Sequence, residues 1–363
     1  MNPSVDRPAS ETADAPALLE QLVAQAERAR ASDVHLQMRS DLAEVSFRLD
    51  GVLSPVTRLP SAVAERVLGR IKFLARLKTY QDSLPQDGRI DRADVNSQND
   101  IRVASYPTVT GEKIVLRLFN SGKVLALDEI GSSASASAQI RSFLLQTSGL
   151  MLLTGPAGSG KTTTIYACLS ELAKQGGRHI ITIEDPVEQI IPGIMQTEVN
   201  CAVGLDFAKA ARHLLRQDPQ TLVIGEIRDE ETANLAVRAG LTGHQVISTL
   251  HAGSCRGVLE RLLVMCPDVS AVASALELVL NQRLLRKTCP DCRGAKCDGC
   301  LQTGYLGRIP VIEWLRVGED VRQRIRAHDI AVIKTENTLA AAAAELVSSG
   351  MTDAAESHRV IGA

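Results

Sequence analysis

The order of apolar and polar positions in the first third of the chain alternates between helical and extended spacing. Apolar residues three and four positions apart predict one helix after Pro16 and a second helix over Val63–Lys78. Alternation of apolar and polar residues, interrupted by turn residues such as Asp50 and Gly51, predicts strands between and after these helices. The expected strands are Asp33–Gln37, Glu44–Leu49, Asp100–Ser105 and Lys113–Phe119. Residues 16–119 are therefore predicted to form a small α+β domain.

Farther along the chain the pattern becomes a repeated alternation of strand, loop and helix. Short apolar stretches are bounded by turn residues and separated by helical patterns. The expected strands are Leu150–Thr154, His179–Ile183, Thr221–Ile224 and Gln245–Leu250. Such alternation predicts a parallel sheet with helices on both faces, which places residues 131–363 in the α/β class. Beyond Arg256 the pattern is mostly helical, apart from a cysteine-rich segment and the stretch Gly304–Trp314.

Two segments lack the periodicity of either domain. Residues 1–15 are rich in Ser, Pro, Ala and Asp and are predicted to be a disordered tail, and residues 120–130 are predicted to be a linker. No apolar run approaches the ~18 residues of a membrane span, and the first residues lack the pattern of a signal peptide. We therefore expect neither a secreted nor a membrane-spanning protein.

Charge and aromatic content bear on the partners that the chain can bind. Forty basic side chains oppose 42 acidic ones, so the net charge of −2 creates no global attraction to nucleic acid or acidic lipid. Five Phe, four Tyr and one Trp offer few platforms on which bases could stack. We therefore expect no nucleic-acid partner.

The strongest chemical signal is a glycine-rich loop, G-P-A-G-S-G-K-T, which follows a predicted strand and opens a predicted helix. Backbone N–H groups of such a loop surround phosphate oxygens, and the helix directs its positive end at them. Lys161 would neutralise phosphate charge, and Thr162 would offer its hydroxyl to Mg²⁺. A chance glycine loop is the alternative, which the flanking elements disfavour. The expected nucleotide-binding residues are Gly155, Pro156, Ala157, Gly158, Ser159, Gly160, Lys161, Thr162 and Thr163.

Carboxylates and histidines follow the other strands of the predicted sheet. Glu184 stands in E-D-P-V-E after one strand, and Glu226 stands in G-E-I-R-D after the next. Carboxylates beyond the carboxyl ends of parallel strands lie in the ligand crevice, where they can orient water or hold Mg²⁺ through its waters. Helix N-capping is the alternative for each carboxylate. His251, and His244 before it, are candidates to sense a γ-phosphate, with a histidine satisfied by backbone groups as the alternative.

Four of the eight cysteines are clustered, and their spacing indicates a metal site. Cys289, Cys292, Cys297 and Cys300 form the pairs C-P-D-C and C-D-G-C, which are four residues apart. Paired C-x₂-C turns place thiolates at the corners of a tetrahedron, the geometry that Zn²⁺ prefers. Disulfides and an iron–sulfur cluster are the alternatives.

Taken together and in this order, the motifs resemble those of the type II secretion and type IV pilus assembly ATPases, hexameric motors of the secretion ATPase superfamily. The glycine-rich loop, Glu184–Glu188, Gly225–Asp229 and Ser248–Ala252 are similar to the family's Walker A, aspartate, Walker B and histidine boxes. The similarity extends upstream, and the matching stretches there are Ala31–His35, Arg48–Gly51, Pro85–Arg89 and Asp100–Pro107. It covers roughly residues 16 to 350.

The resemblance implies a RecA-like P-loop domain joined to a smaller, PAS-like N-terminal domain, with ATP and Mg²⁺ held between them. Glu184 would then polarise the attacking water and Glu226 would be the Walker B acid. Gly225 stands where many P-loop proteins have an aspartate, so which glutamate is the base stays open. Arg102 and Arg117 match arginines that the family places facing the nucleotide, where they would neutralise charge on the transferred phosphoryl group. A solvated sheet face is the alternative for both arginines.

The resemblance also implies a cytoplasmic homohexamer at the cytoplasmic face of the inner membrane. Inner-membrane platform and docking proteins would be its partners and its only connection to the membrane, and hydrolysis would drive assembly of a pilus or pseudopilus. A four-cysteine zinc element is typical of assembly ATPases and is lacking in retraction motors. Because residues 289–300 hold the two pairs unusually close together, we expect the four ligands without a full protruding metal domain.

Two further expectations come from differences between this chain and the family. We expect the chain to lack the family's first N-terminal domain, for which it has no room, and to have a shortened C-terminus. The alternative functions are a pilus-retraction or DNA-uptake and conjugation motor, and a nucleotide-dependent scaffold that does not hydrolyse. The acids Glu184 and Glu226 argue against the scaffold.

Overall fold

The computed structural model describes residues 14–118 and 124–362, which form two compact units. One unit comprises Met1–Gly122 with Cys289–Gly307, and the other comprises Lys123–Thr288 with Arg308–Ala363. The predicted tail at 1–15 lies almost wholly outside the described residues, although Ala15 already begins a helix. The predicted linker at 120–130 also begins outside the described residues.

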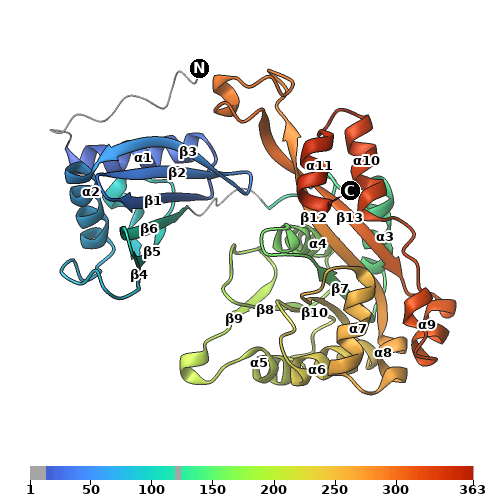
Figure 1. Cartoon of the computed structure of the whole chain (residues 1–363). Helices are drawn as coiled ribbons and strands as arrows, with labels where there is room; N and C mark the ends of the chain where they lie inside the picture. The colour runs from blue at the N-terminus through green and yellow to red at the C-terminus, as the bar shows by residue number, and fades with distance from the viewer. Residues whose placement is uncertain (1–13, 119–123, 363) are drawn as a thin grey trace. The chain divides into compact units, whose positions relative to one another are not determined.

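The first unit contains a six-stranded antiparallel sheet in the order β3-β2-β1-β6-β5-β4. Its strands are β1 (Asp33–Arg39), β2 (Leu42–Leu49), β3 (Val52–Pro60), β4 (Gln86–Ile90), β5 (Ile101–Thr108) and β6 (Gly111–Leu118). Helices α1 (Ala15–Arg28) and α2 (Ser61–Leu74), both blue in Figure 1, bury their apolar stripes against this sheet. On β5, Ile101 and Val103 enter this core while Arg102 between them is exposed. The sheet therefore has one apolar face and one polar face.

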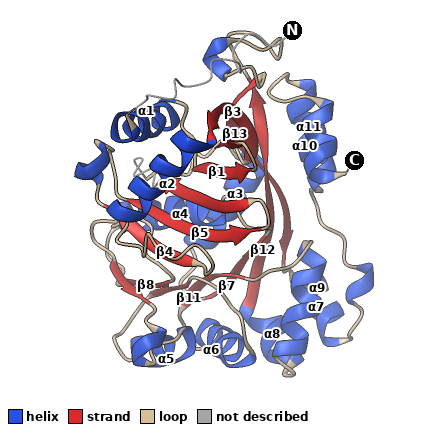
Figure 2. Cartoon of the chain, turned by 60° about the vertical axis from the view of Figure 1, so that its left-hand side comes forward, coloured by secondary structure: helices blue, strands red, loops and turns tan. Residues whose placement is uncertain are grey.

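The second unit is built around a seven-stranded sheet in the order β13-β12-β7-β11-β10-β8-β9, in which the strands from β12 to β9 are parallel. Its strands are β7 (Gly149–Thr154), β8 (Ile180–Glu184), β9 (Met195–Glu198), β10 (Thr221–Ile224), β11 (Gln245–Thr249), β12 (Leu276–Thr288) and β13 (Tyr305–Arg316). Figure 2 shows the two long strands β12 and β13 running together at one edge.

Helices cover both faces of this sheet, as the alternating pattern predicts. Leu150 and Leu152 of β7 point toward a core shared with α5 to α9, whereas Met151 and Leu153 point toward a core shared with α3 and α4. The helices are α3 (Ala134–Leu144), α4 (Lys161–Gln175), α5 (Phe207–Leu214), α6 (Glu230–Leu241), α7 (Cys255–Met265), α8 (Val269–Ala275), α9 (Glu319–Arg326), α10 (Leu339–Ser348) and α11 (Ala354–Ile361). The predicted α/β fold with a smaller α+β domain is confirmed.

The expectation that the chain beyond Arg256 is mostly helical was wrong for residues 276–288, which form the longest strand of the sheet. β12 is buried on both faces along its first half, and polar residues such as Glu277, Asn281 and Gln282 interrupt its apolar positions without the strict alternation of a half-buried strand. Periodicity alone does not separate such a pattern from a buried helix. Among the described residues, every helix is too short or too polar to cross a membrane.

Candidate functional site

The glycine-rich loop connects the end of β7 to the start of α4. Gly155, Gly158 and Gly160 all have positive φ, at 141°, 74° and 87°. A Cβ atom at Gly155 would lie 2.3 Å from the carbonyl oxygen of Gln282, and one at Gly160 would lie 2.8 Å from the Gln282 amide nitrogen. Backbone conformation and the close approach of β12 therefore both require glycine here.

Gln282 of β12, which the sequence analysis missed, supports this loop through two hydrogen bonds. Its buried Nε2 donates to the carbonyl of Ser159 at 2.8 Å, and its Oε1 accepts from the hydroxyl of Thr164 at 2.8 Å. One side chain thus fixes the loop and the first turn of α4 together. No local motif marks a glutamine that reaches a loop so distant in the sequence.

Lys161 is the first residue of α4, and its Nζ donates to the carbonyls of Gly155 at 2.8 Å and Pro156 at 3.0 Å. Burial lowers the pKa of Lys161, while the nearby Glu226 opposes this effect. Of the predicted nucleotide-binding residues, those that line a cavity of about 260 Å³ are Ala157, Gly158, Lys161 and Thr162. Those that do not line it are Gly155, Pro156, Ser159, Gly160 and Thr163.

The same cavity receives three of the predicted catalytic side chains. Glu184 ends β8, Glu226 follows β10 and His251 follows β11, and all three line the cavity. Because these strands are parallel to one another and to β7, their carboxyl ends meet at the edge that carries the glycine-rich loop. Asp229 caps α6, so Glu226 does not serve as that helix cap.

Polar contacts connect the residues that follow three of these strands. Oε1 of Glu226 lies 2.8 Å from Nε2 of His251, and Oε2 accepts from Nε of Arg228 at 2.8 Å. Arg228 also approaches Asp185, with Nη1 3.6 Å from Oδ2, and its guanidinium stacks over the ring of Phe207. Arg228 was not singled out, although it stands inside the G-E-I-R-D stretch. The hydrogen bond to Glu226 raises the pKa of Arg228, which keeps this cation in the site.

Glu184 has a different environment, made of neutral donors. Its carboxylate accepts hydrogen bonds from the hydroxyls of Tyr166 and Thr182 and from the side-chain amide of Gln196. The sequence analysis missed all three donors. For Tyr166 a signal was available, because it lies four residues after Thr162 and therefore on the same face of α4.

The structure does not bring His244 into this group. His244 precedes β11, whose start lies at the edge of the sheet opposite the glycine-rich loop. Its Nδ1 lies 3.2 Å from the carbonyl of Ala239, so the backbone-satisfied alternative describes it. The expectation that His244 senses a γ-phosphate does not fit this position. A whole buried strand separates His244 from His251, which puts the two rings at opposite ends of β11.

Arg102 and Arg117 belong to the first unit, where they are directly paired across β5 and β6 on the polar face of the sheet. Nε of Arg117 lies 3.0 Å from Oδ1 of Asp33, whose other oxygen lies 3.2 Å from Nε of Arg48. The two arginines therefore place positive charge on the polar face of this sheet. Their role toward a nucleotide stays a prediction.

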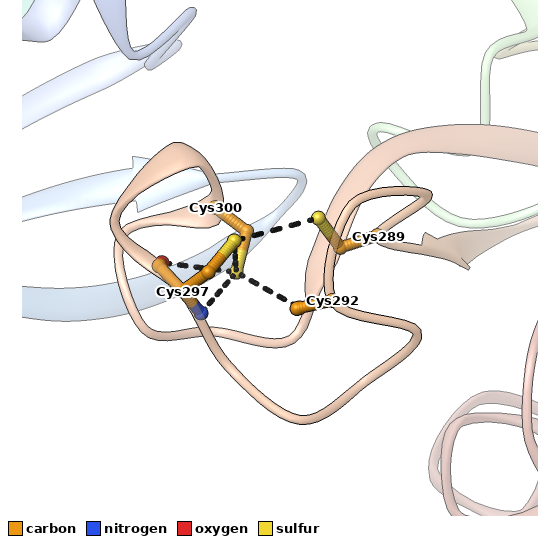
Figure 3. A group of neighbouring side chains, drawn as sticks. All are labelled: Cys289, Cys292, Cys297 and Cys300. Carbon is orange, nitrogen blue, oxygen red and sulfur yellow. Dashed lines mark hydrogen bonds between the residues drawn. The ribbon is translucent and has the colours of Figure 1, made fainter.

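The four clustered cysteines converge, as Figure 3 shows. Their Sγ atoms all lie within 4.8 Å of one another, with Cys289 to Cys297 and Cys292 to Cys300 both at 3.9 Å. Four thiolates at ~2.3 Å around one tetrahedral Zn²⁺ would be about 3.8 Å apart, so the spacing fits this ion. All four cysteines are free, which disfavours the disulfide alternative. Backbone N–H groups of Cys297 and Gly304 point at Sγ of Cys300, at 3.3 and 3.2 Å.

Comparison with known proteins gives consistent results. The family model "Type II/IV secretion system protein" matches residues 9–359. The putative type II secretion system protein E of Escherichia coli K12 is 37% identical over 334 residues, which cover 85% of this chain and 68% of that protein. The type IV pilus assembly ATPase TfpB of Acinetobacter baylyi is 35% identical over 367 residues, 91% of this chain and 63% of that protein.

A solved structure supports the fold. The X-ray structure of the Legionella pneumophila ATPase DotB superimposes with a TM-score of 0.70 and covers 98% of each chain. At 19% sequence identity this likeness bears on the fold alone.

Proposed function

Because the chain belongs to the family of type II/IV secretion system proteins, we propose that it hydrolyses ATP to drive the assembly of a pilus or pseudopilus. The observation that carries the proposal is the single cavity in which the glycine-rich loop meets Glu184, Glu226 and His251. Three strands and one helix terminus supply these groups, so the fold itself sets their spacing.

Each group in the cavity has a task suited to phosphoryl transfer. The loop N–H groups and Lys161 hold the β- and γ-phosphates, and the hydroxyl of Thr162 is placed to accept Mg²⁺. Bound Mg²⁺ would supply a positive charge that neutralises the phosphates. His251 donates to the γ-phosphate from the carboxyl end of β11. The site needs no covalent intermediate, since positioning and charge compensation are the main catalytic terms for this reaction.

The two glutamates have different roles in this proposal. One oxygen of Glu226 contacts His251 and the other accepts from Arg228, so each oxygen keeps an acceptor position toward Mg²⁺ or its waters, which suits Glu226 to the Walker B role. Glu184 is bonded only by neutral donors and retains an acceptor position on Oε2. We therefore assign Glu184 to polarise the attacking water.

We further propose that six copies form a ring in which the first unit closes over the nucleotide and presents Arg102 and Arg117. Closure would convert hydrolysis into domain motion. The ring would act in the cytoplasm at the inner membrane, held there by platform and docking proteins, without nucleic acid. Cys289, Cys292, Cys297 and Cys300 would hold one zinc ion that stabilises the turn between β12 and β13.

Steady-state ATP turnover by the purified full chain tests the enzymatic part of the proposal. The parent should hydrolyse ATP with Mg²⁺, and Glu184→Gln should bind ATP with unchanged affinity but lose turnover by ~100-fold or more. Absence of turnover in the parent ring would favour the scaffold alternative. Stimulation by DNA, and not by platform proteins, would favour the nucleic-acid motor.

A further inference from the structure

The carboxylate of Glu184 is oriented by three donors that come from three different elements. The hydroxyl of Tyr166 on α4 donates to Oε2, Thr182 on β8 donates to Oε1 at 2.5 Å, and Nε2 of Gln196 on β9 donates to Oε1 at 3.0 Å. Glu184 is only 7% exposed and Thr182 is fully buried. The carboxylate therefore has little freedom to rotate.

The same bonds leave one acceptor position on the carboxylate. Two oxygens offer about four acceptor positions, of which Oε1 uses two and Oε2 uses one. Neutral donors compensate the cost of burying the charge without cancelling it. Glu184 lines the cavity, so the position left on Oε2 can accept a hydrogen bond from one water molecule.

Tyr166 does more than donate to Glu184. Its hydroxyl oxygen accepts from the backbone N–H of Glu188 at 3.1 Å and of Gln189 at 3.4 Å, so it also holds the segment that follows β8. Burial and the bond to Glu184 raise the pKa of Tyr166, which keeps the hydroxyl a donor at every physiological pH. Because α4 begins at Lys161, the phenol ties the Glu184 segment to the phosphate-binding helix.

We infer that Tyr166 is a positioning residue for hydrolysis, which aims the free lone pair of Glu184 at the attacking water through its hydrogen bond to Oε2. Thr182 assists from the other carboxylate oxygen. This inference rests on the proposed ATPase function and adds to it the group that orients the base.

The test is the split between kcat and KM for ATP in variants that remove one hydroxyl each. Tyr166→Phe keeps the ring and loses the donor, so kcat should fall by ~10-fold or more while KM and nucleotide affinity change by less than about 2-fold. Tyr80→Phe is the matched control, because Tyr80 is 83% exposed and far from Glu184 in the sequence. Its kcat should equal that of the parent.

A second pair of variants separates positioning from packing. Thr182→Val preserves shape and loses the hydroxyl, whereas Thr182→Ser keeps the hydroxyl, so the serine variant should turn over at least ~5-fold faster than the valine variant. A parent-like kcat in Tyr166→Phe, or equal losses in both Thr182 variants, would overturn the inference. A parent chain that does not hydrolyse ATP would instead refute the proposed function, so the two failures are distinguishable.

Discussion

Nε2 of His251 lies 2.8 Å from Oε1 of Glu226, so the side chains that follow two neighbouring parallel strands are in direct contact. A γ-phosphate in the cavity would compete with Glu226 for the proton on this nitrogen. Under the proposed function, this competition would let the imidazole sense whether the phosphate is present. Arg228 donates to the other oxygen of Glu226 and also approaches Asp185, which follows β8.

His251→Ala should reduce ATP turnover by ~10-fold or more and leave nucleotide affinity nearly unchanged. The reason is that the imidazole acts on the leaving phosphate more than on bound ATP. His244→Ala is the matched control, since His244 lies at the other end of β11. Turnover assays and fluorescent-nucleotide titrations on both variants measure the difference. Equal effects of the two substitutions would contradict the placement of His251 at the phosphate.

Lys161→Ala should lower hydrolysis by at least ~100-fold, because it removes the charge that the loop places against the phosphates. Lys174→Ala, at the last turn of the same helix, serves as the control and should keep parent turnover. Near-normal turnover in Lys161→Ala would remove the ATPase assignment from this loop.

Elemental analysis should find one zinc per chain, held by the four clustered cysteines. Cys292→Ser should loosen the ion, because a three-thiolate site is open to water, whereas Cys201→Ser outside the cluster should retain it. Competition with a chromophoric chelator measures the difference in affinity. Iron with visible absorption, or no metal at all, would refute the zinc assignment.

The parts of the site that could be predicted are those encoded by neighbouring residues. A phosphate loop, a carboxylate after a strand and a pair of C-x₂-C turns each carry their chemistry within a few positions. The parallel sheet then brings Glu184, Glu226 and His251 to one edge, as open α/β sheets do. The position of His244 before β11 could not be predicted, because motif spacing does not say at which end of a strand a residue lies.

Contacts between distant elements could not be predicted. Gln282 reaches the glycine-rich loop from β12, and β12 itself was missed because its apolar and polar residues do not alternate strictly. The donors to Glu184 come from three elements, and a single hydroxyl or amide has no spacing pattern to reveal its partner. Only Tyr166, one turn beyond Thr162, could have been found from helix geometry.

The C-terminal helix α11 is attached to β12 by a buried carboxylate, which makes stability depend on pH. Burial alone would raise the pKa of Glu356, but hydrogen bonds from Arg359 and Arg286 outweigh it and hold the pKa at about 2, below its ordinary 4.5. This lowered pKa contributes about 3 kcal/mol of stability that is fully present above pH ~4.5 and is lost as the pH falls toward 2.

Glu356→Gln should therefore lower the free energy of unfolding by about 3 kcal/mol near pH 7, with a difference that shrinks as the pH falls from about 4.5 toward 2. Fluorescence of Trp314, the single tryptophan, follows unfolding of the same unit in denaturant titrations. The control is Glu345→Gln on the exposed face of α10. If the difference in free energy of unfolding stayed constant across this pH range, the ion pairs of Glu356 with Arg286 and Arg359 would not be its cause.

The last prediction concerns the arginines of the first unit, Arg102 and Arg117. Both project from the polar face of its sheet, and Asp33 keeps its contact with Arg48 when Arg117 is removed, so neither substitution should unfold the unit. Charge supplied as the γ-phosphate departs can accelerate hydrolysis by ~10³-fold while adding less to ground-state binding. We therefore expect Arg102→Ala and Arg117→Ala to bind ATP normally and to lose most turnover in the assembled ring.

Arg39→Ala provides the comparison, because Arg39 is an exposed arginine at the end of β1 in the same sheet. Turnover should be measured above and below the concentration at which the ring forms. If closure of the first unit brings the two arginines to the nucleotide, the loss of turnover in Arg102→Ala and Arg117→Ala, relative to Arg39→Ala, should grow as the ring assembles. Parent rates in both variants at ring-forming concentrations would show that closure of the first unit over the nucleotide is not how this chain hydrolyses ATP.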